Sequence, residues 1–361
     1  MKTLLLTLEF PPFKGGVANY YGHLANYWPL GENLLILDNS RGELVSGRGF
    51  FAWWPGFSTL KEKLRLSRID YVLVGQILPL GTITWILSLF RPLKYAVILH
   101  GLDFSAALRV PRKRFLARLI LKRADKIICA NSYTADKVKE FYSGAAEKIS
   151  VVNPGVPAGV PQAADGELAE LRNKHGLNDK IVLFSLGRLV RRKGFDQVIQ
   201  ALTALAAEGF DNLAYCLAGR GVDEAYLRSL VPAEMIDKII FLGELTEKEK
   251  WQWLELSDIF AMPARDLDGD FEGFGIVYLE ANLCGKPVIA GRAGGVADAV
   301  VDDQTGIIVD PEDLNDLKAG IRRLAADPEL RKTLGEQGRS RALNEFNWEK
   351  QVAKLVKGIK G

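Results

Sequence analysis

Two glutamates, Glu272 and Glu280, flank a glycine-rich segment and are separated by seven residues. Glu280 lies inside a pattern that predicts a helix, and Gly285 and Pro287 predict where that helix ends. Carboxylates accept hydrogen bonds from sugar hydroxyls, and the free backbone N–H groups of a helix start can hold a sugar or phosphate oxygen. The segment therefore has the groups needed to bind a phosphorylated sugar.

A cationic run from Arg188 to Lys193 follows directly after an apolar strand pattern at 181–185. A strand end that carries an arginine and a lysine suits a diphosphate, because arginine offers a fork of donors and lysine a point charge. Arg191 and Arg192, inside the run, are expected to face solvent. A solvated basic loop is the alternative interpretation of the same residues.

Gly15 and Gly16 form a pair between the first strand pattern and the first helix pattern. Glycines at such a turn let backbone N–H groups approach an anion at the helix start. The pair lacks G-x-G-x-x-G spacing, which disfavours a nicotinamide site, and a purely structural tight turn is the alternative.

Metal ions are the other partners to consider. Asp266, Asp268 and Asp270 have D-x-D spacing that suits Mg²⁺ beside a phosphate, but the cationic run already supplies positive charge for a diphosphate. The three histidines and three cysteines include no pair at ligand spacing, which argues against zinc. These residues are His23, His100, His175, Cys129, Cys216 and Cys284. We expect a metal-independent site.

The chain has 361 residues, of which 48% are hydrophobic and 25% charged, as in a globular protein of two domains. Its start resembles a strand more than a signal peptide, and the apolar stretch at 77–90 is too short to cross a bilayer. The cysteines are odd in number and lie in apolar contexts, which suits reduced thiols in the cytoplasm.

Apolar strand patterns alternate with helical patterns along the whole chain, which predicts an α/β fold with two doubly wound parallel sheets. A polar, proline-rich stretch after residue 153 predicts a linker, with domains at 1–160 and 161–345 and a final segment, 346–361, that returns to the first. The expected strands are 3–10, 34–38, 70–74, 95–100 and 126–130 in the first domain, and 181–185, 213–218, 238–242, 258–262, 287–290 and 307–309 in the second.

Charge is divided unevenly between the two parts. Residues 1–160 hold 21 Lys and Arg against 11 Asp and Glu, whereas the remainder holds 26 against 33. A basic amphipathic helix is expected at 111–123, with Arg114, Arg118 and Lys122 on one face and an apolar stripe of Phe115, Leu116, Leu119 and Ile120. This helix suits an anionic membrane surface, with further anchors at Phe51, Trp53, Trp54 and Phe57, although the apolar stripe is equally expected of a core-facing helix.

Taken together, these motifs resemble glycosyltransferase family 4, whose fold is GT-B. The resemblance covers nearly the whole chain. It rests on Gly15-Gly16, Asn153-Pro154-Gly155-Val156, Gly187-Arg188 with Lys193-Gly194, Ala218-Gly219-Arg220-Gly221, 241–246, the Glu272 to Glu280 spacing, Ala293-Gly294-Gly295-Val296 and Phe346-Asn347-Trp348. It implies two Rossmann-like domains that face a deep cleft, with the first binding the acceptor, the second binding a nucleotide-sugar, and a C-terminal helix that crosses back.

The resemblance also implies roles for individual residues. Arg188 and Lys193 would hold the donor diphosphate, Glu272 the hydroxyls of the transferred sugar and Glu280 the ribose. His100 matches the position that reaches the sugar near its reacting carbon. The implied catalytic residues are His100, Arg188, Lys193 and Glu272. The implied nucleotide-sugar contacts are Gly15, Gly16, Gly187, Arg188, Lys193, Gly219, Leu245, Glu272, Gly273, Phe274, Gly275, Ile276 and Glu280.

The segment from Met262 to Ala281 is most similar to phosphatidyl-myo-inositol mannosyltransferases and related GDP-mannose-dependent enzymes. This implies transfer of a hexose, with retention of configuration, from GDP-mannose to a lipid-linked or sugar acceptor at the inner face of the cell membrane. Same-face displacement is expected, because no side chain is plainly placed as a nucleophile. The alternatives are a UDP-glucose or UDP-N-acetylglucosamine donor with a soluble acceptor, an epimerase or phosphorylase on the same fold, and a non-catalytic nucleotide-sugar binding protein. No base-reading motif accompanies the basic half, so nucleic acid is not expected as a partner.

Overall fold

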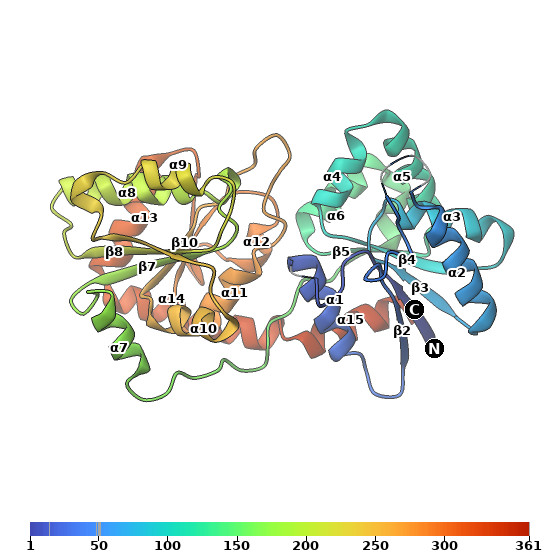
Figure 1. Cartoon of the computed structure of the whole chain (residues 1–361), viewed down its shortest axis with the longest axis horizontal. Coiled ribbons are helices and arrows are strands. Elements are labelled where there is room, and N and C mark those ends of the chain that lie inside the picture. The colour runs from blue at the N-terminus through green and yellow to red at the C-terminus, as the bar shows by residue number, and fades with distance from the viewer. Residues whose placement is uncertain (14, 48, 50–51, 361) are drawn as a thin grey trace. The chain divides into compact units, whose positions relative to one another are not determined.

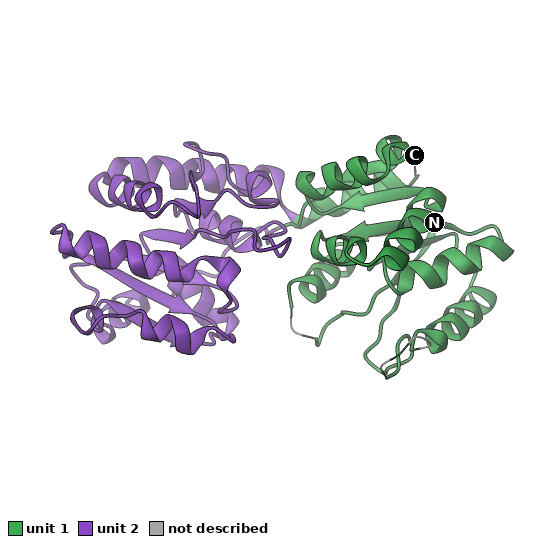
Figure 2. Ribbon diagram, turned by 90° about the horizontal axis from the view of Figure 1, so that it is seen from above, with its two compact units in different colours: residues 1–155, 348–361 green, residues 156–347 purple. Residues whose placement is uncertain are grey.

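The computed structural model describes residues 1–13, 15–47, 49 and 52–360, which divide into two compact units (Figures 1 and 2). Unit 1 consists of Met1–Gly155 and Trp348–Gly361, and unit 2 of Val156–Asn347. The chain thus changes unit at 155/156 and 347/348, where the sequence suggested 160/161 and 345/346. Each unit has its own hydrophobic core and its own parallel sheet.

The sheet of unit 1 has, in the described residues, six parallel strands in the order β2-β1-β3-β4-β5-β6. Its central strands β3, β4 and β5 are buried apart from their first lysines, Lys94 and Lys126, as expected of a parallel sheet covered on both faces. The strands are β1 (Lys2–Leu6), β2 (Asn33–Leu37), β3 (Tyr71–Val74), β4 (Lys94–Leu99), β5 (Lys126–Cys129) and β6 (Ile149–Val151).

Helices cover both faces of this sheet (Figure 1). Leu4 and Leu6 of β1 join a core cluster with residues from α2 to α6, while α1 and α15, which pack together, cover the opposite face. The helices are α1 (Gly16–Asn26), α2 (Trp54–Leu66), α3 (Leu80–Phe90), α4 (Leu102–Leu108), α5 (Pro111–Arg123), α6 (Ser132–Phe141), the 3-10 helix η1 (Ser143–Lys148) and α15 (Trp348–Lys360).

The sheet of unit 2 also has six parallel strands in the described residues, in the order β12-β11-β10-β7-β8-β9. Each strand of this unit that the sequence predicts is present. The strands are β7 (Ile181–Leu186), β8 (Leu213–Ala218), β9 (Ile239–Gly243), β10 (Ile259–Met262), β11 (Val288–Gly291) and β12 (Gly306–Val309).

The helices of unit 2 form a layer on each face of its sheet. α8 and α13 pack on one face, and α10, α11 and α14 on the other. The helices are α7 (Glu167–Lys174), η2 (Arg191–Lys193), α8 (Phe195–Ala207), α9 (Glu224–Ser229), η3 (Ala233–Met235), α10 (Glu247–Leu256), α11 (Ile276–Leu283), α12 (Val296–Ala299), α13 (Leu314–Ala326) and α14 (Pro328–Glu345).

Strand order reverses once in each sheet, between β1 and β3 in unit 1 and between β7 and β10 in unit 2. At such a reversal the helices after the two central strands pass to opposite faces, so the loops at the carboxyl ends of the strands leave a crevice that binds ligands. In unit 2 these loops are 187–194 and 263–275, the two segments in which the sequence predicts site residues.

Candidate active site

The turn after β7 directs two cations into unit 2. The short helix η2 ends at Gly194, which has φ of 73° and takes up the left-handed conformation that glycine adopts without strain. A Cβ at this position would overlap the carbonyl oxygen of Pro263 in the loop after β10. Gly194 therefore lets the two loops at the strand-order reversal, 187–194 and 263–275, pack against each other. Arg192 and Lys193 are buried there.

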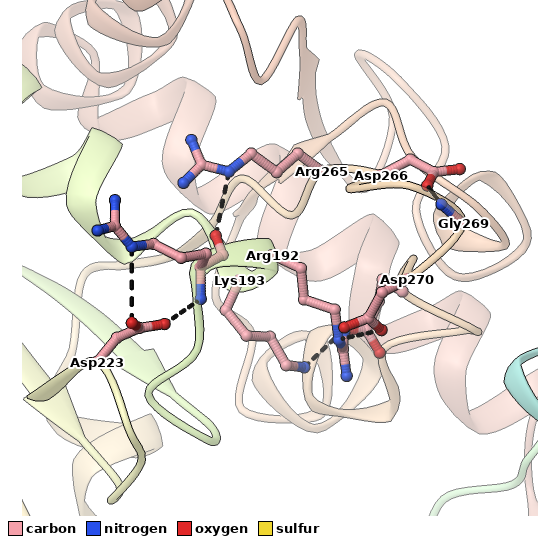
Figure 3. A network of polar contacts seen from close by, with 9 residues as sticks. Arg192, Lys193, Asp223, Arg265, Asp266, Gly269 and Asp270 are labelled. Carbon is pink, nitrogen blue, oxygen red and sulfur yellow. Dashed lines mark hydrogen bonds and ion pairs between the residues drawn. The ribbon is translucent and has the colours of Figure 1, made fainter.

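Glu272 forms a buried ion cluster with Arg192 and Lys193, the two cations labelled in Figure 3. Its Oε2 accepts hydrogen bonds from Lys193 Nζ at 2.6 Å and from the Arg192 guanidinium at 2.7 Å. The three residues are between 6% and 9% exposed. The expectation that Arg192 faces solvent is wrong, whereas Arg191 is exposed and its guanidinium lies over the Tyr226 ring.

Opposite charges act against the effect of burial at Glu272 and Lys193. Burial alone would raise the pKa of the Glu272 carboxyl, but Lys193 and Arg192 outweigh burial and hold this pKa below its ordinary value. Burial lowers the pKa of the Lys193 ammonium, and the Glu272 charge opposes that effect. Both cations donate to one oxygen of Glu272, and in the part of the chain that the structure describes no donor bonds its second oxygen, which can accept from a ligand hydroxyl.

Arg265, in the loop after β10, contacts and stabilises the turn at 191–193 that follows β7. Its guanidinium pairs with Asp196 at 2.6 Å and donates to the backbone carbonyl of Arg191 at 3.1 Å. The backbone N–H of Arg265 donates to the carbonyl of Arg192 at 2.8 Å. Both members of the Arg265–Asp196 pair are buried. Removing either one would leave an uncompensated charge, so this pair fixes where the turn lies.

The acidic segment 266–270 forms a tight hairpin. Leu267 and Asp270 exchange backbone hydrogen bonds, and the carboxylate of Asp266 accepts from the N–H of Gly269. Asp270 forms an ion pair with Arg192 at 3.1 Å, although its side chain is 55% exposed. Among the described residues, no three His, Cys, Asp or Glu side chains form a group that could hold a metal ion. The structure assigns the acidic hairpin a contact with the buried cluster.

Glu280 occupies a second part of the site on α11. Its carboxylate pairs with Lys250 of α10 at 2.7 Å, and the same lysine pairs with Glu247 at 2.6 Å. A capping box between Thr246 and Glu249 fixes the start of α10, directly after the half-buried Leu245. Helices α10 and α11 thereby hold two carboxylates around one ammonium group.

Arg188 differs from the buried cations because its side chain is exposed, and within the described ranges no carboxylate pairs with it. Close backbone packing surrounds it: a Cβ at Gly219 would overlap the carbonyl oxygen of Gly187. Gly275 precedes α11 with φ of 77°, and a Cβ there would strike the Tyr278 ring. The glycines thus keep the ends of β7, β8 and the α11 loop within reach of one ligand.

Unit 1 carries the other predicted residues at the carboxyl edge of its own sheet. Gly15 is the N-cap of α1 and Gly16 is its first residue, and His100 follows β4 directly. His100 Nε2 lies 2.8 Å from the hydroxyl of Tyr21, and its backbone N–H donates to Asp103 at 3.0 Å. Burial lowers the pKa of the His100 imidazole to about 4, so this histidine is neutral near neutral pH.

The structure therefore brings together Lys193 and Glu272, which were predicted from the sequence, and adds Arg192, Lys250 and Arg265, which were not. Arg192 stands next to Lys193 in the sequence, but nothing in the run indicates which side chain turns inward. The other predicted residues of unit 2 lie in the loops after β7, β8, β9 and β10 or in α11. They are Gly187, Arg188, Gly219, Leu245, Gly273, Phe274, Gly275, Ile276 and Glu280.

Unit 2 therefore combines buried cations, paired carboxylates and glycine loops at the strand-order reversal of a parallel sheet, and these groups suit a phosphorylated ligand. The sequence pattern of Glycosyltransferase Family 4 matches residues 31–159, and that of Glycosyl transferases group 1 matches residues 168–341. A GDP-mannose-dependent monoacylated α-(1-6)-phosphatidylinositol monomannoside mannosyltransferase of Corynebacterium glutamicum is 30% identical, over 96% of this chain and 95% of the relative. The chain belongs to glycosyltransferase family 4 and is a glycosyltransferase.

Other relatives agree with this assignment. A GDP-mannose-dependent α-(1-6)-phosphatidylinositol monomannoside mannosyltransferase of Mycolicibacterium smegmatis is 28% identical over 99% of this chain and 98% of its own length. Among solved structures, Anabaena HepE in complex with UDP has a TM-score of 0.81 at 18% identity, with both chains fully covered. WaaG, a glycosyltransferase involved in lipopolysaccharide biosynthesis, has a TM-score of 0.71 at 17% identity, over 99% of this chain and 100% of its own. The predicted GT-B fold is thereby confirmed.

Proposed function

We propose that this glycosyltransferase transfers mannose from GDP-mannose, with retention of configuration and without a metal ion, to a lipid-linked acceptor at an anionic membrane. In this proposal unit 2 binds the donor and unit 1 the acceptor. The observation that carries the proposal is the buried Glu272 carboxylate, held by Lys193 and Arg192 beside the exposed Arg188. The names of the full-length relatives support the choice of donor and acceptor.

The diphosphate of the donor suits the cations that follow β7. Arg188 is exposed and offers its fork to one phosphate, while Lys193 lies close enough for the Arg188 charge to lower its pKa. The backbone N–H groups at the start of α11 would bind phosphate or sugar oxygens. Glu272 would then accept hydrogen bonds from sugar hydroxyls through its second oxygen.

The nucleoside is proposed to bind between α10 and α11. Glu280 would accept hydrogen bonds from the ribose hydroxyls, and Glu247 is exposed beside it at 76%. Guanine presents two neighbouring donors, which one carboxylate can accept together, whereas uracil presents a single N–H between two carbonyl oxygens. An acidic side chain at this place therefore favours GDP over UDP.

Transfer is proposed to be a same-face displacement. The bond between the sugar C1 and the diphosphate oxygen breaks, the acceptor oxygen bonds C1 on the same face, and the acceptor proton passes to the departing phosphate. Arg188 and Lys193 would stabilise the negative charge that develops on that phosphate, a contribution that is fixed before reaction begins. Orientation of the two substrates supplies much of the remaining rate.

A membrane-bound acceptor is supported by the surface of α5 in unit 1. Arg112, Lys113, Arg114 and Arg118 are exposed there, and Phe115 is 63% exposed among them, whereas Ala117, Ile120 and Leu121 face the core. Basic residues around an exposed aromatic ring suit an anionic lipid surface. Of the other proposed anchors, Trp54 is exposed, Trp53 and Phe57 pack against the core, and Phe51 lies outside the described residues.

No helix within the described ranges combines the length and apolar character needed to cross a bilayer. We therefore propose peripheral contact with the inner face of the cell membrane as the mode of attachment. Cys129 and Cys216 are buried free thiols, in keeping with the reducing cytoplasm.

One experiment tests the proposed function. The protein is incubated with GDP-mannose, UDP-glucose and UDP-N-acetylglucosamine in turn, with and without lipid extract, and release of nucleotide and labelling of lipid are measured. We expect release and labelling with GDP-mannose and lipid together, unchanged by EDTA, and an α-linked product. Loss of turnover in EDTA would contradict metal independence. Turnover only with a UDP-sugar and a soluble acceptor would contradict the proposed GDP-mannose donor and lipid-linked acceptor. Binding of nucleotide without turnover would favour a non-catalytic binding protein.

A further inference from the structure

The hydroxyl of Tyr21 lies between two hydrogen-bonding partners at the carboxyl edge of the unit 1 sheet. It donates to the backbone carbonyl of Gly75 at 2.6 Å and lies 2.8 Å from Nε2 of His100. Tyr21 belongs to α1 and is fully buried, while Gly75 follows β3 and His100 follows β4. Helix α1 and the loops after β3 and β4 therefore meet at one phenol oxygen.

Counting protons determines the state of the histidine. A phenol has one proton, and the two oxygens at 2.6 Å would repel each other unless that proton lay between them. The proton of Tyr21 is therefore donated to Gly75, and the phenol oxygen can only accept from His100. Because the imidazole is neutral, the remaining proton sits on Nε2, and Nδ1 is left with a free lone pair that accepts hydrogen bonds.

Aromatic packing fixes the plane of the same ring. Tyr20 and Tyr21 meet the imidazole edge to face, with centroids 5.0 Å and 5.4 Å away. His100 as a whole residue is only partly buried. The ring can neither rotate freely nor exchange its proton between nitrogens without breaking the Tyr21 bond.

We infer that Tyr21 is a positioning residue that holds His100 as the Nε2–H tautomer, so that Nδ1 accepts a hydrogen bond from a sugar hydroxyl. The inference rests on the proposed function for its sugar ligand, which is the donor hexose or the acceptor. An Nδ1–H tautomer would present a donor at Nδ1 in place of an acceptor. Tyr21 thereby determines that the sugar hydroxyl at Nδ1 acts as a hydrogen-bond donor.

The tautomer can be read directly by long-range proton–nitrogen NMR of the protein labelled with ¹⁵N-histidine. The chain has three histidines, so the signals of His100 are assigned by their absence from the His100→Gln variant. We expect the Nε2–H tautomer in the unsubstituted protein and a mixture of tautomers in Tyr21→Phe, which keeps the ring but lacks the hydroxyl. Tyr95→Phe is the matched control, because the buried hydroxyl of Tyr95 also donates to a carbonyl, that of Ile120, at 2.8 Å.

Kinetics provide the second readout. We expect Tyr21→Phe to lower kcat for transfer by about 10-fold or more, with GDP affinity unchanged and Tyr95→Phe close to the unsubstituted enzyme. If Tyr21→Phe lowers the rate of donor hydrolysis by water as much as the rate of transfer, the sugar hydroxyl that donates to His100 belongs to the donor hexose. If the substitution raises only the KM for the acceptor, that hydroxyl belongs to the acceptor.

The Nδ1–H tautomer in the unsubstituted protein, or no tautomer change in Tyr21→Phe, would overturn the inference. Equal kinetic losses in both phenylalanine variants would also overturn it. Failure of the proposed function has a different signature, because no nucleotide-sugar would then be turned over while the tautomer signals stayed readable.

Discussion

At the scale of single residues, the site of unit 2 is organised around charge balance. Glu272 and Asp270 offset the buried Arg192 and Lys193, while Arg188 carries an exposed positive charge near them. Burial of an ion pair removes hydration from both charges, so such a pair is stable only where several hydrogen bonds hold it. Its members therefore have fixed positions before a ligand binds. A diphosphate would therefore meet cations that are already oriented.

Lys193→Met tests the role of the ammonium group. We expect kcat to fall by about 100-fold to 1000-fold, because a fixed positive charge beside the departing phosphate is lost. The fold should survive, since Arg192 still pairs with Glu272. Lys332→Met, on the exposed surface of α14, is the control and should leave activity unchanged. The measurement is kcat by steady-state kinetics. Activity retained in Lys193→Met would contradict a role of this lysine in the active site.

His100 predicts a particular pH dependence of stability. Its pKa is about 4 in the folded chain and about 6.5 when unfolded, so the unfolded state takes up a proton first as pH falls. The folded state should lose up to about 3 kcal/mol from this group between pH 6.5 and pH 4. Burial raises the pKa of Asp103 to about 6, which has the opposite effect over part of this range.

The contribution of His100 is isolated by comparison with His100→Gln, in which Asp103 is retained. Urea unfolding is measured from pH 7 to pH 4 for both proteins. We expect the free energy of unfolding to fall less steeply with decreasing pH in the variant. Parallel curves would show that His100 is not held neutral by the fold.

At the scale of elements, two loops at a strand-order reversal hold the site, and glycine conformation sets their packing. Gly194 combines a left-handed backbone with direct contact to Pro263. We expect Gly194→Ala to lower the free energy of unfolding by about 3 kcal/mol, the sum of backbone strain and overpacking. Gly176 has a similar φ of 65° with no atom within 4 Å, so Gly176→Ala should cost only about 1 kcal/mol. Equal losses in chemical denaturation would contradict a tight contact between the loops.

The periodic patterns of the sequence predict the strands of both sheets well, because strands in a covered parallel sheet are continuous apolar runs. Strand β6 was missed, since its three residues are only half buried at a sheet edge. Among the residues of the site, Lys193 and Glu272 follow from their spacing and their resemblance to a family. Arg192 could not be predicted, because its direction depends on Arg265 and Pro263, some 70 positions later in the chain.

At the scale of the whole molecule, the two units have opposite net charge. Unit 1 holds 25 Lys and Arg against 12 Asp and Glu, and unit 2 holds 22 against 32. The net charges are therefore +13 and −10, a sharper division than a single cut at residue 160 gives, because residues 348–361 add four lysines and one glutamate to unit 1. Such a distribution attracts unit 1 to anionic surfaces over a range that salt shortens.

The combined variant Lys113→Glu, Arg114→Glu and Arg118→Glu tests membrane contact through α5. Each basic residue near a charged bilayer contributes on the order of 1 kcal/mol, so we expect binding to vesicles that contain anionic lipid to fall by at least about 100-fold. Sedimentation of the protein with vesicles measures this, and binding should also weaken in high salt. The control, Lys174→Glu with Lys332→Glu, changes exposed lysines of unit 2. Equal binding by both variants would exclude α5 as the contact surface.

The chain passes between the units twice, and the two passages are neighbours. Val156 donates to the carbonyl of Phe346 at 2.7 Å, and Gly155 packs directly on Trp348. Unit 2 is consequently an insertion within unit 1, and its first residue, Val156, is hydrogen-bonded to Phe346, one residue before its end. A gene fragment encoding 156–347 should yield a folded protein that binds GDP in calorimetry, whereas a few residues linking Gly155 to Trp348 should suffice to produce unit 1 by itself. Each half of the enzyme can then be titrated separately with its own substrate.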